Sequence, residues 1–525
     1  MFGFQYNDSQ ALLIHQSSKA TVQPVMSPVP ALHFAIKATS KPWWSGLAFI
    51  FALLFGFDPV GWCADSYNAQ TGILSIPSVM VNGTQYNNVQ VTIAKVVSFG
   101  SGAGSSPIGT VDTYNTSNSQ LQIPLVTVGS DTSYVNAVIV VGTVTFVGPN
   151  NVLPVLVNGG YQNSLPNMLT TSVTVCVPNT KSCTTIDNIQ VDTGSSGLRI
   201  LASTLSGLGL PSQKNTSNGA PIYECAAFAD GVIWGQVATA DITLGSEVAN
   251  SVPIQIITDT GGAKIPKACS SQGFNESSLQ YLGTNGLIGV GLFLQDCGSY
   301  CTNSAAGMYF TCATVSVCNQ ATQPLSMQVS NPVAFFPTDN NGVVLQLPAL
   351  SSTGASSVNG NLIFGIGTQI NNTPSNAATT LAVPATGSLA GNFTALYNGK
   401  AMPNSFIDSG SGSLFFNDNN LTACSSTGVA AGYYCPGNNT SVSAVAISAA
   451  IASAPNLNLT LGNAEYLFNE NNGIDAVFNN IGSPAGTVLP NSFDFGMPFF
   501  FGRSVYTGFE QKNPQGPFFA FQAYP

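Results

Sequence analysis

Two similar segments, far apart in the chain, limit its possible folds more than any other feature. Residues 189–200 read IQVDTGSSGLRI and residues 405–416 read SFIDSGSGSLFF. In both, an apolar run precedes Asp, a hydroxyl residue, Gly and Ser, and Leu follows shortly after. One such segment is an ordinary turn sequence, because Asp, Ser and Gly are favoured in turns. Two copies, each near the front of one half of residues 151–525, indicate two halves that fold alike and meet at these loops.

The paired loops suit two carboxylates that act together. A Gly after each Asp permits a tight backbone, and nearby hydroxyl groups can hydrogen-bond the carboxylates. If Asp192 and Asp408 face each other across a water molecule, like charge prevents both from ionising and the pair holds one proton. One carboxylate then takes a proton from water while its protonated partner polarises a carbonyl group, which hydrolyses a peptide bond. The supporting residues expected beside this dyad are Thr193, Gly194, Ser195, Ser409, Gly410 and Ser411.

The position of the histidines excludes several other mechanisms. His15 and His33 both precede the apolar run GLAFIFALLFGF at residues 46–57, so a chain processed after this run has no histidine. This excludes Ser-His-Asp and Cys-His catalysis and any metal site with His ligands. Carboxylates remain for acid–base chemistry near or below neutral pH. We therefore expect no cofactor and no metal.

The charge composition indicates an exported protein with a largely neutral surface. Charged residues make up 6 % of the chain, against about a quarter in average globular proteins. The formal net charge of −10 disfavours a nucleic acid partner. Few ion pairs are available to be lost in acid, which fits a protein suited to low pH, although a low-charge exported protein is an equal alternative.

The first 64 residues are interpreted as a leader. The apolar run at 46–57 follows Lys37 and Lys41 and has the length of a secretory signal rather than of a membrane span. It is either cleaved or kept as an anchor, so we expect a periplasmic, cell-surface or extracellular protein that contacts a membrane only through this segment. Ten cysteines follow Cys63, and an even number in an exported chain predicts disulfides. The natural pairs are 176 with 183, 312 with 318, and 424 with 435.

Residues 65–150 contain an internal repeat. Residues 74–100 match residues 121–148, and each copy alternates Val and Ile with polar residues around a turn. This pattern predicts two β-hairpin units in one small domain. A propeptide, a spacer and a binding module all remain open as its role. The rest of the chain is expected to be mainly β, with a helix at 444–454 and a dividing loop at 354–360, giving halves of 151–355 and 356–525.

The chain resembles the pepsin-like aspartic peptidases. Besides the two Asp loops, NGLIGVG (285–291) and DFGMPFFFGRSVYTGFE (494–510) resemble the apolar-apolar-Gly elements that follow each catalytic loop in that family. FADGVIWGQVATADITLG (228–245) resembles the flap hairpin of its first lobe. The resemblance implies a bilobal β-barrel fold, a catalytic dyad of Asp192 and Asp408, a polypeptide substrate and a monomer. The residues that it places at the flap or the substrate cleft are Phe228, Gly231, Trp234 and Arg199. The motif VDTGSSGLR is also similar to that of an uncharacterised family of exported bacterial proteins.

Three departures from that family concern catalysis more than fold. Phe228 stands where the family usually has Tyr, and Arg199 stands where it usually has Trp. Arg199 is therefore expected to stack on Phe228 as a cation–π pair. Gly412 replaces a hydroxyl residue after the second Asp loop. Because of these changes, a pepsin-like binding protein without catalytic activity remains an alternative function. A β-rich adhesion or coat protein is a third possibility.

Overall fold

The structure is a computed structural model that describes residues 65–68, 72–81, 84–100, 112–115, 117–128, 132–146, 151–259, 265–314, 317–448 and 455–524. The expected leader lies outside these residues. The chain divides into two compact units, with the division between Pro149 and Asn150. No helix in the described ranges is long and apolar enough to span a membrane.

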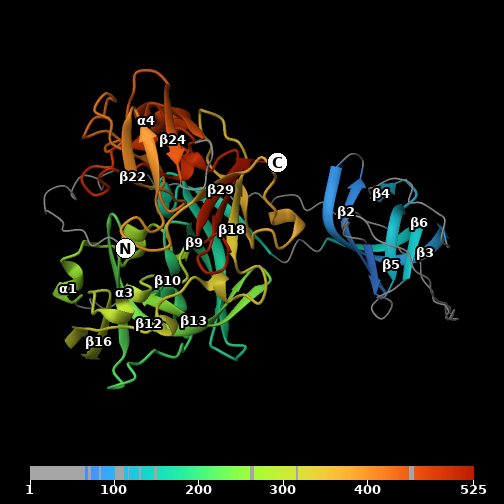
Figure 1. The fold of residues 1–525 in the computed structure, drawn as a ribbon, viewed down its shortest axis with the longest axis horizontal. Coiled ribbons are helices and arrows are strands. Elements are labelled where there is room, and N and C mark those ends of the chain that lie inside the picture. Colours follow the sequence, from blue (N-terminus) through green and yellow to red (C-terminus); the bar gives the residue numbers. More distant parts are fainter. Residues whose placement is uncertain are drawn as a thin grey trace. The chain divides into compact units, whose positions relative to one another are not determined.

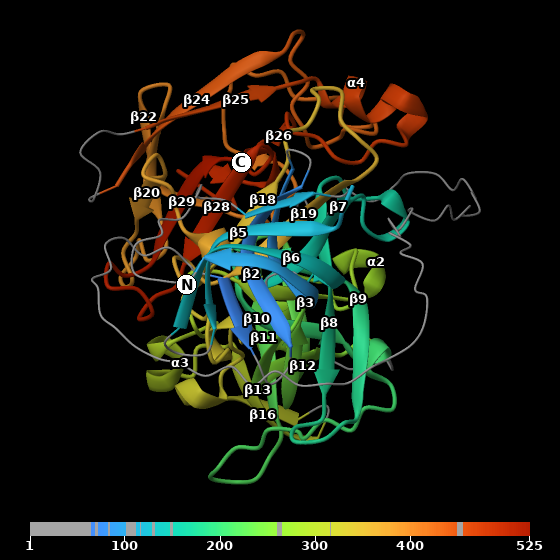
Figure 2. The same ribbon diagram turned by 90° about the vertical axis from the view of Figure 1, so that its right-hand side faces the viewer.

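The amino-terminal unit is one six-stranded sheet, whose strands β2, β3, β5 and β6 are labelled in Figure 2. Its strands are β1 (Asp65–Asn68), β2 (Ile73–Val81), β3 (Thr84–Gly100), β4 (Asp112–Asn115), β5 (Gln120–Val128) and β6 (Thr132–Phe146). Each copy of the repeat forms the expected antiparallel hairpin, β2 with β3 and β5 with β6. In addition, β1 pairs in parallel with β5 and β4 with β2, so the repeat also includes the short strands DSYN and DTYN.

The carboxy-terminal unit contains the two Asp loops and is built on two sheets. The larger has 16 strands in the order β17-β16-β11-β12-β13-β10-β15-β9-β8-β7-β19-β18-β28-β29-β20, with β14 beside β12. Because β12 pairs with β8 as well as with β13, the sheet closes on itself around the first Asp loop. Figure 2 shows the long neighbouring strands β8 and β9 of this part.

The strands of the larger sheet have the following bounds: β7 (Val152–Asn158), β8 (Met168–Cys176), β9 (Cys183–Asp192), β10 (Ser196–Leu201), β11 (Ile222–Ala227), β12 (Gly231–Leu244), β13 (Glu247–Ile257), β14 (Phe274–Asn275), β15 (Gly286–Val290), β16 (Tyr309–Thr314), β17 (Val317–Gln320), β18 (Gly342–Leu347), β19 (Val358–Phe364), β20 (Thr379–Ala382), β28 (Arg503–Gly508) and β29 (Phe518–Ala523).

The smaller sheet has seven strands in the order β25-β24-β21-β22-β27-β23-β26 and surrounds the second Asp loop. Its strands are β21 (Phe393–Tyr397), β22 (Lys400–Ile407), β23 (Leu414–Phe415), β24 (Thr440–Ile447), β25 (Asn456–Leu461), β26 (Gly482–Ser483) and β27 (Asp494–Phe495). Helices are short: α1 (Lys267–Ser270), α2 (Leu279–Leu282), α3 (Ser299–Asn303) and α4 (Ala464–Asn469). The expected mainly β class is confirmed.

Neighbouring antiparallel strands join the two halves of this unit. The order β7-β19-β18-β28-β29 combines the first strand of the unit with its last two. Figure 1 shows β18 and β29 between the green strands of the first half and the orange strands of the second. One hydrophobic core runs through both halves and includes Val191 and Ile288 behind the first Asp loop and Ile407 and Phe495 behind the second.

Two expectations about local structure are wrong. Residues 444–447 continue β24 rather than starting a helix, because Val442, Ala444 and Ala446 alternate inward with a period of two. Residues 449–454 of the expected helix lie outside the described part. The loop expected at 354–360 ends at residue 357, since Val358 begins β19 and pairs with Val157 of β7.

Five disulfides are present among the described residues, and they include the three pairs expected from sequence. These are Cys176–Cys183, Cys312–Cys318 and Cys424–Cys435, together with Cys225–Cys269 and Cys297–Cys301. Several disulfides in one chain indicate an oxidising, exported environment.

Candidate active site

The first Asp loop (residues 192–195) and the second Asp loop (residues 408–411) occupy equivalent positions in the two halves. Strand β15 lies parallel to β9 with Gly289 opposite Asp192, and β27 lies parallel to β22 with Phe495 opposite Ile407. The returning strands pair in the same way, Leu198 with Ile288 and Leu414 with Phe495. The sequence similarity of the loops therefore corresponds to the same local strand arrangement.

Reciprocal hydrogen bonds hold the two loops together. The backbone N–H of Thr193 donates to Ser409 Oγ at 3.1 Å, and the backbone N–H of Ser409 donates to Thr193 Oγ1 at 2.9 Å. The Ser409 hydroxyl also donates to the carbonyl oxygen of Val191 at 2.8 Å. Thr193 and Ser409 are both buried, so these bonds fix one loop against the other away from solvent.

The glycine of each loop lies directly against the aspartate of the other. A Cβ atom at Gly194 would stand 2.6 Å from Cγ of Asp408, and one at Gly410 would stand 2.6 Å from Oδ1 of Asp192. Real Cβ atoms do not approach so closely, and no larger residue fits without movement. The two expected aspartates are therefore brought face to face.

Each aspartate is oriented by its own loop. Asp192 Oδ1 accepts the backbone N–H groups of Gly194 at 2.8 Å and Ser195 at 3.2 Å, and the Ser195 hydroxyl donates to Oδ2. Asp408 Oδ1 accepts the N–H of Gly410 at 2.7 Å, and the Ser411 hydroxyl contacts its Oδ2 at 3.0 Å. All six residues expected to support the dyad therefore surround it.

The pKa of Asp408 is raised well above the usual range of an aspartate. Burial has the largest effect, followed by the negative charge of Asp192, and a side-chain hydrogen bond with Asp192 acts in the same direction. The backbone N–H of Gly410 opposes the shift. Burial and like charge therefore both favour the protonated form of Asp408.

The four residues expected at the flap or the cleft lie on or beside the β11–β12 hairpin, but not all reach its surface. Phe228 follows β11, and its backbone N–H donates to the carbonyl of Gly231 at 2.8 Å across the turn. The guanidinium carbon of Arg199 lies 5.8 Å from the centroid of the Phe228 ring, as the expected cation–π pair requires. Trp234 is only 2 % exposed and is held between Tyr223 and Phe310, so it supports the hairpin from inside.

Arg199 has stronger partners than Phe228. Its Nη2 atom donates to Glu224 at 2.6 Å and to Asp296 at 3.0 Å, and all three side chains are buried. The Tyr309 hydroxyl donates to Asp296 at 2.7 Å. Burial and the nearby charge of Glu224 raise the pKa of Asp296, while Arg199 opposes that shift. The cluster ties β10, β11 and β16 together directly behind the first Asp loop.

The comparisons with known proteins give a family but no activity. A family model described as "Protein of unknown function (DUF3443)" matches residues 148–521. The chain belongs to this family. No curated protein matches the chain. A similar solved structure is the aspartic proteinase from Irpex lacteus, with a TM-score of 0.38 and 15 % identity over 71 % of this chain and 97 % of that one.

In this member of the family, sequence reasoning misses one carboxyl group beside the dyad. Asp494 is 1 % exposed, and its Oδ2 lies 2.6 Å from the Ser411 hydroxyl oxygen. Its position in the apolar run NSFDFGMPFFF is the signal that could have identified it, since charged residues form only 6 % of the chain. A carboxyl group in such a run rarely lacks a specific partner.

Two further acidic residues lie near the hairpin turn. Asp230 is exposed at the turn. Burial and the charge of Asp230 raise the pKa of Glu276 to about 9. Of the two, Glu276 is therefore the one that keeps its proton near neutral pH.

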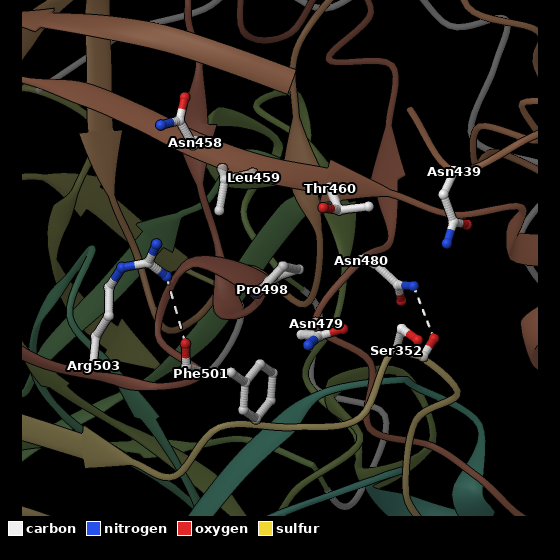
Figure 3. Close-up of a pocket in the computed structure, with 10 residues that line it drawn as sticks. All are labelled: Ser352, Asn439, Asn458, Leu459, Thr460, Asn479, Asn480, Pro498, Phe501 and Arg503. Atoms are coloured by element: carbon white, nitrogen blue, oxygen red, sulfur yellow. Dashed lines mark hydrogen bonds between the residues drawn. The ribbon is translucent and has the colours of Figure 1, made fainter. Parts of the chain in front are cut away.

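A hollow of about 360 Å³ lies elsewhere in the carboxy-terminal unit (Figure 3). Its lining includes the amide side chains of Asn458 and Asn480, the ring of Phe501 and the guanidinium of Arg503. None of its lining residues belongs to either Asp loop, so this hollow is separate from the dyad.

Proposed function

We propose that this protein is an exported aspartic endopeptidase that hydrolyses peptide bonds at acidic pH with Asp192 and Asp408. The observation that carries the proposal is the facing pair of carboxyl groups, each oriented by its own loop, with a raised pKa on one of them. Such a pair supplies a base and an acid at one pH without histidine.

The two carboxyl groups have different roles in this mechanism. Asp408 enters the reaction protonated and hydrogen-bonds the carbonyl oxygen of the peptide, while Asp192 accepts a proton from the attacking water. Water adds to the carbonyl carbon, and Asp408 gives its proton to the developing oxyanion. Collapse of this intermediate breaks the C–N bond: Asp192 gives the proton that it took from water to the leaving nitrogen, and one hydroxyl group of the intermediate returns a proton to Asp408 as the new carboxyl group forms. Ser195 and Ser411 hold the outer oxygens of the dyad throughout these steps.

The proposed substrate is an extended polypeptide bound between the dyad and the β11–β12 hairpin. Phe228 at the hairpin turn offers an apolar surface for substrate side chains, and Arg199 supports its ring from behind. In this proposal the enzyme is a monomer and needs neither metal nor cofactor. It acts in the periplasm, at the cell surface or outside the cell. The disulfides support an exported location.

The test is cleavage of a denatured protein from about pH 3 to about pH 7, the range over which carboxyl groups titrate. The leaderless wild type is compared with Asp192→Asn, Asp408→Asn and the matched control Asp418→Asn. Asp418 lies in the second half and accepts a hydrogen bond from the Tyr397 hydroxyl at 2.7 Å, outside the dyad. We expect activity on the acid side that both dyad variants lose and the control keeps, together with inhibition by pepstatin.

A binding protein without catalysis is the alternative that this experiment tests. A wild type that is folded, as judged by circular dichroism, yet inert over the whole range would contradict the peptidase proposal. Loss of activity in only one dyad variant would contradict the shared-proton mechanism while leaving a hydrolase.

A further inference from the structure

We propose that Asp494 is a neutral carboxylic acid that donates a hydrogen bond to Ser411 and thereby directs the Ser411 hydroxyl toward Asp408. Asp494 is then a positioning residue for the dyad. This inference rests on the proposed function for its kinetic test, but not for its spectroscopic test.

The Ser411 hydroxyl has two carboxyl neighbours but only one proton. The Ser411 oxygen contacts Asp494 Oδ2 at 2.6 Å and Asp408 Oδ2 at 3.0 Å. A hydroxyl has one proton to donate, so it cannot donate to both carboxylates at once. Both contacts are hydrogen bonds only if one of the two carboxyl groups donates a proton to Ser411. In the proposed mechanism the proton of Asp408 is directed at the peptide carbonyl, which leaves Asp494 as the donor to Ser411.

The surroundings of Asp494 select it as that donor. Its side chain is 1 % exposed, and its Oδ1 atom has no hydrogen-bond partner in the described part of the chain. The ion pairs found in that part belong to Arg199 and do not reach Asp494. A buried carboxylate with an unpaired oxygen and no cation carries a large desolvation cost, whereas a neutral acid does not.

The charges around Asp494 act in the same direction. Burial raises its pKa well above the usual range, the hydrogen bond with Ser411 opposes this, and the charge of Asp192 raises it further. The other carboxyl group that faces it is Asp408, across Ser411. One negative charge on the dyad therefore makes a second charge on Asp494 less favourable.

The other half of the molecule provides an internal comparison. Asp494 lies opposite Phe406 in the parallel pair β22–β27, and Leu287 lies opposite Gln190 in the equivalent pair β9–β15. The position that carries a carboxyl group behind the second Asp loop therefore carries an apolar side chain behind the first. Within the described residues, the Ser195 hydroxyl accordingly donates to Asp192 and to no second carboxyl group.

The consequence for the reaction concerns the moment at which Asp408 gives up its proton. Asp408 then carries negative charge, which a hydroxyl donor at its Oδ2 stabilises. An ionised Asp494 would compete for the same proton of Ser411. Because a neutral Asp494 only donates, the Ser411 proton stays available to Asp408.

The first test does not require activity. Infrared spectra in the region of the carboxylic acid C=O stretch are compared at neutral pH for the full chain, Asp494→Asn, Asp494→Leu and the control Asp418→Asn. We expect both Asp494 variants to lose one protonated-acid band that the wild type and the control share. An unchanged acid band in both Asp494 variants, with the loss of a carboxylate band instead, would show that Asp494 is ionised and overturn the inference.

The second test asks whether Asp494 acts through Ser411. We expect Asp494→Leu to lower kcat about tenfold with little change in KM, as for one hydrogen bond to a charged group. Asp494→Asn should lower kcat less than Asp494→Leu does, because the amide group can still donate a hydrogen bond to Ser411. In a Ser411→Ala background, Asp494→Leu should lower kcat no further.

Two kinetic results would overturn the inference: additive losses in the double variant, or Asp494→Asn more damaging than Asp494→Leu. Thermal melts of every variant separate these effects from loss of fold. If the wild type cleaves nothing, the proposed function fails, and the infrared comparison still decides the state of Asp494.

Discussion

At the scale of single residues, the two loop glycines leave the least room for change. Gly194 and Gly410 each pack against the aspartate of the opposite loop, with a virtual Cβ 2.6 Å from it. We expect Gly194→Ala and Gly410→Ala each to lower kcat/KM at least about a hundredfold. The added methyl group would push the two loops apart, and a shift of about 1 Å between the two carboxyl groups is enough for a loss of that size. The measurement is cleavage of a denatured protein together with the melting temperature.

Gly209→Ala is the matched control for these variants, since a Cβ there meets nothing within 4 Å. It should keep both activity and melting temperature. Full activity in Gly194→Ala would mean that the two loops do not meet as described.

The residues of the site differ in how well sequence alone could predict them. Asp192 and Asp408 were predictable because the turn chemistry around each is local and repeated. The partners of Arg199 were not predictable. Glu224 and Asp296 come from other parts of the chain, and the strand pairing that brings them to Arg199 has no local signature. The apolar run around Asp494 is a local signal of a buried carboxyl group, but its contact with Ser411 depends on strand pairing of the same kind.

At the scale of elements, the errors of prediction have a common cause. Residues 444–447 are small and apolar, which suits a helix, but β24 pairs with both β21 and β25 and this pairing decides the structure. The segment 354–360 contains turn residues, yet its last part joins β19 beside β7. In both cases tertiary pairing overrides local propensity.

The disulfide between Cys225 and Cys269 should stabilise the hairpin side of the first half. It spans 44 residues, whereas Cys297–Cys301 spans 4. Loop-closure entropy in the unfolded chain predicts a loss of about 4 kcal/mol when the first is replaced by two alanines and about 2 kcal/mol for the second. Denaturant unfolding of the two double variants measures this. Equal losses would contradict the entropic account.

The amino-terminal unit contains its own pair of aspartates, one from each copy of the repeat. Asp65 and Asp112 are both buried, and Asp112 Oδ2 has no partner in the described part of the chain. Burial raises the pKa of Asp65 to about 6, and burial with the charge of Asp65 raises that of Asp112 to about 9. The folded unit therefore keeps protons that the unfolded chain releases above about pH 4.

This unit should lose stability as the pH rises from about 4 through 6 toward 9, because the unfolded state then binds fewer protons than the folded one. Asp112→Asn should weaken that dependence. Hydrogen exchange of peptides from β1 to β6 in the full chain, at pH 5 and about pH 8, measures the effect after correction for intrinsic rates. Protection that does not fall with pH in the wild type would contradict the raised pKa values.

For the molecule as a whole, the small number of charged residues and the buried carboxylic acids should make the folded state most stable at acidic pH. The carboxy-terminal unit also holds carboxyl groups whose pKa is raised in the folded state, among them Asp408, Asp494 and Glu276. A group with a raised folded pKa is neutral in both states below its unfolded pKa. Above that value only the unfolded state ionises, so stability falls with pH until the folded pKa is reached.

The free energy of unfolding should therefore be largest near pH 4 and decrease toward about pH 9, where Glu276 also ionises. Each such group contributes up to about 1.4 kcal/mol per pH unit between its two pKa values. Denaturant unfolding at pH 4, 6 and about 8, at one ionic strength, measures this slope, and Glu276→Gln should flatten it. Because carboxylates in ion pairs would have the opposite slope, stability that rises from pH 4 to about pH 8 would show that such pairs dominate instead. If stability is largest at acidic pH, the folded state is most stable in the pH range where Asp192 and Asp408 share one proton. Folding and the proposed reaction would then both depend on carboxyl groups that stay protonated.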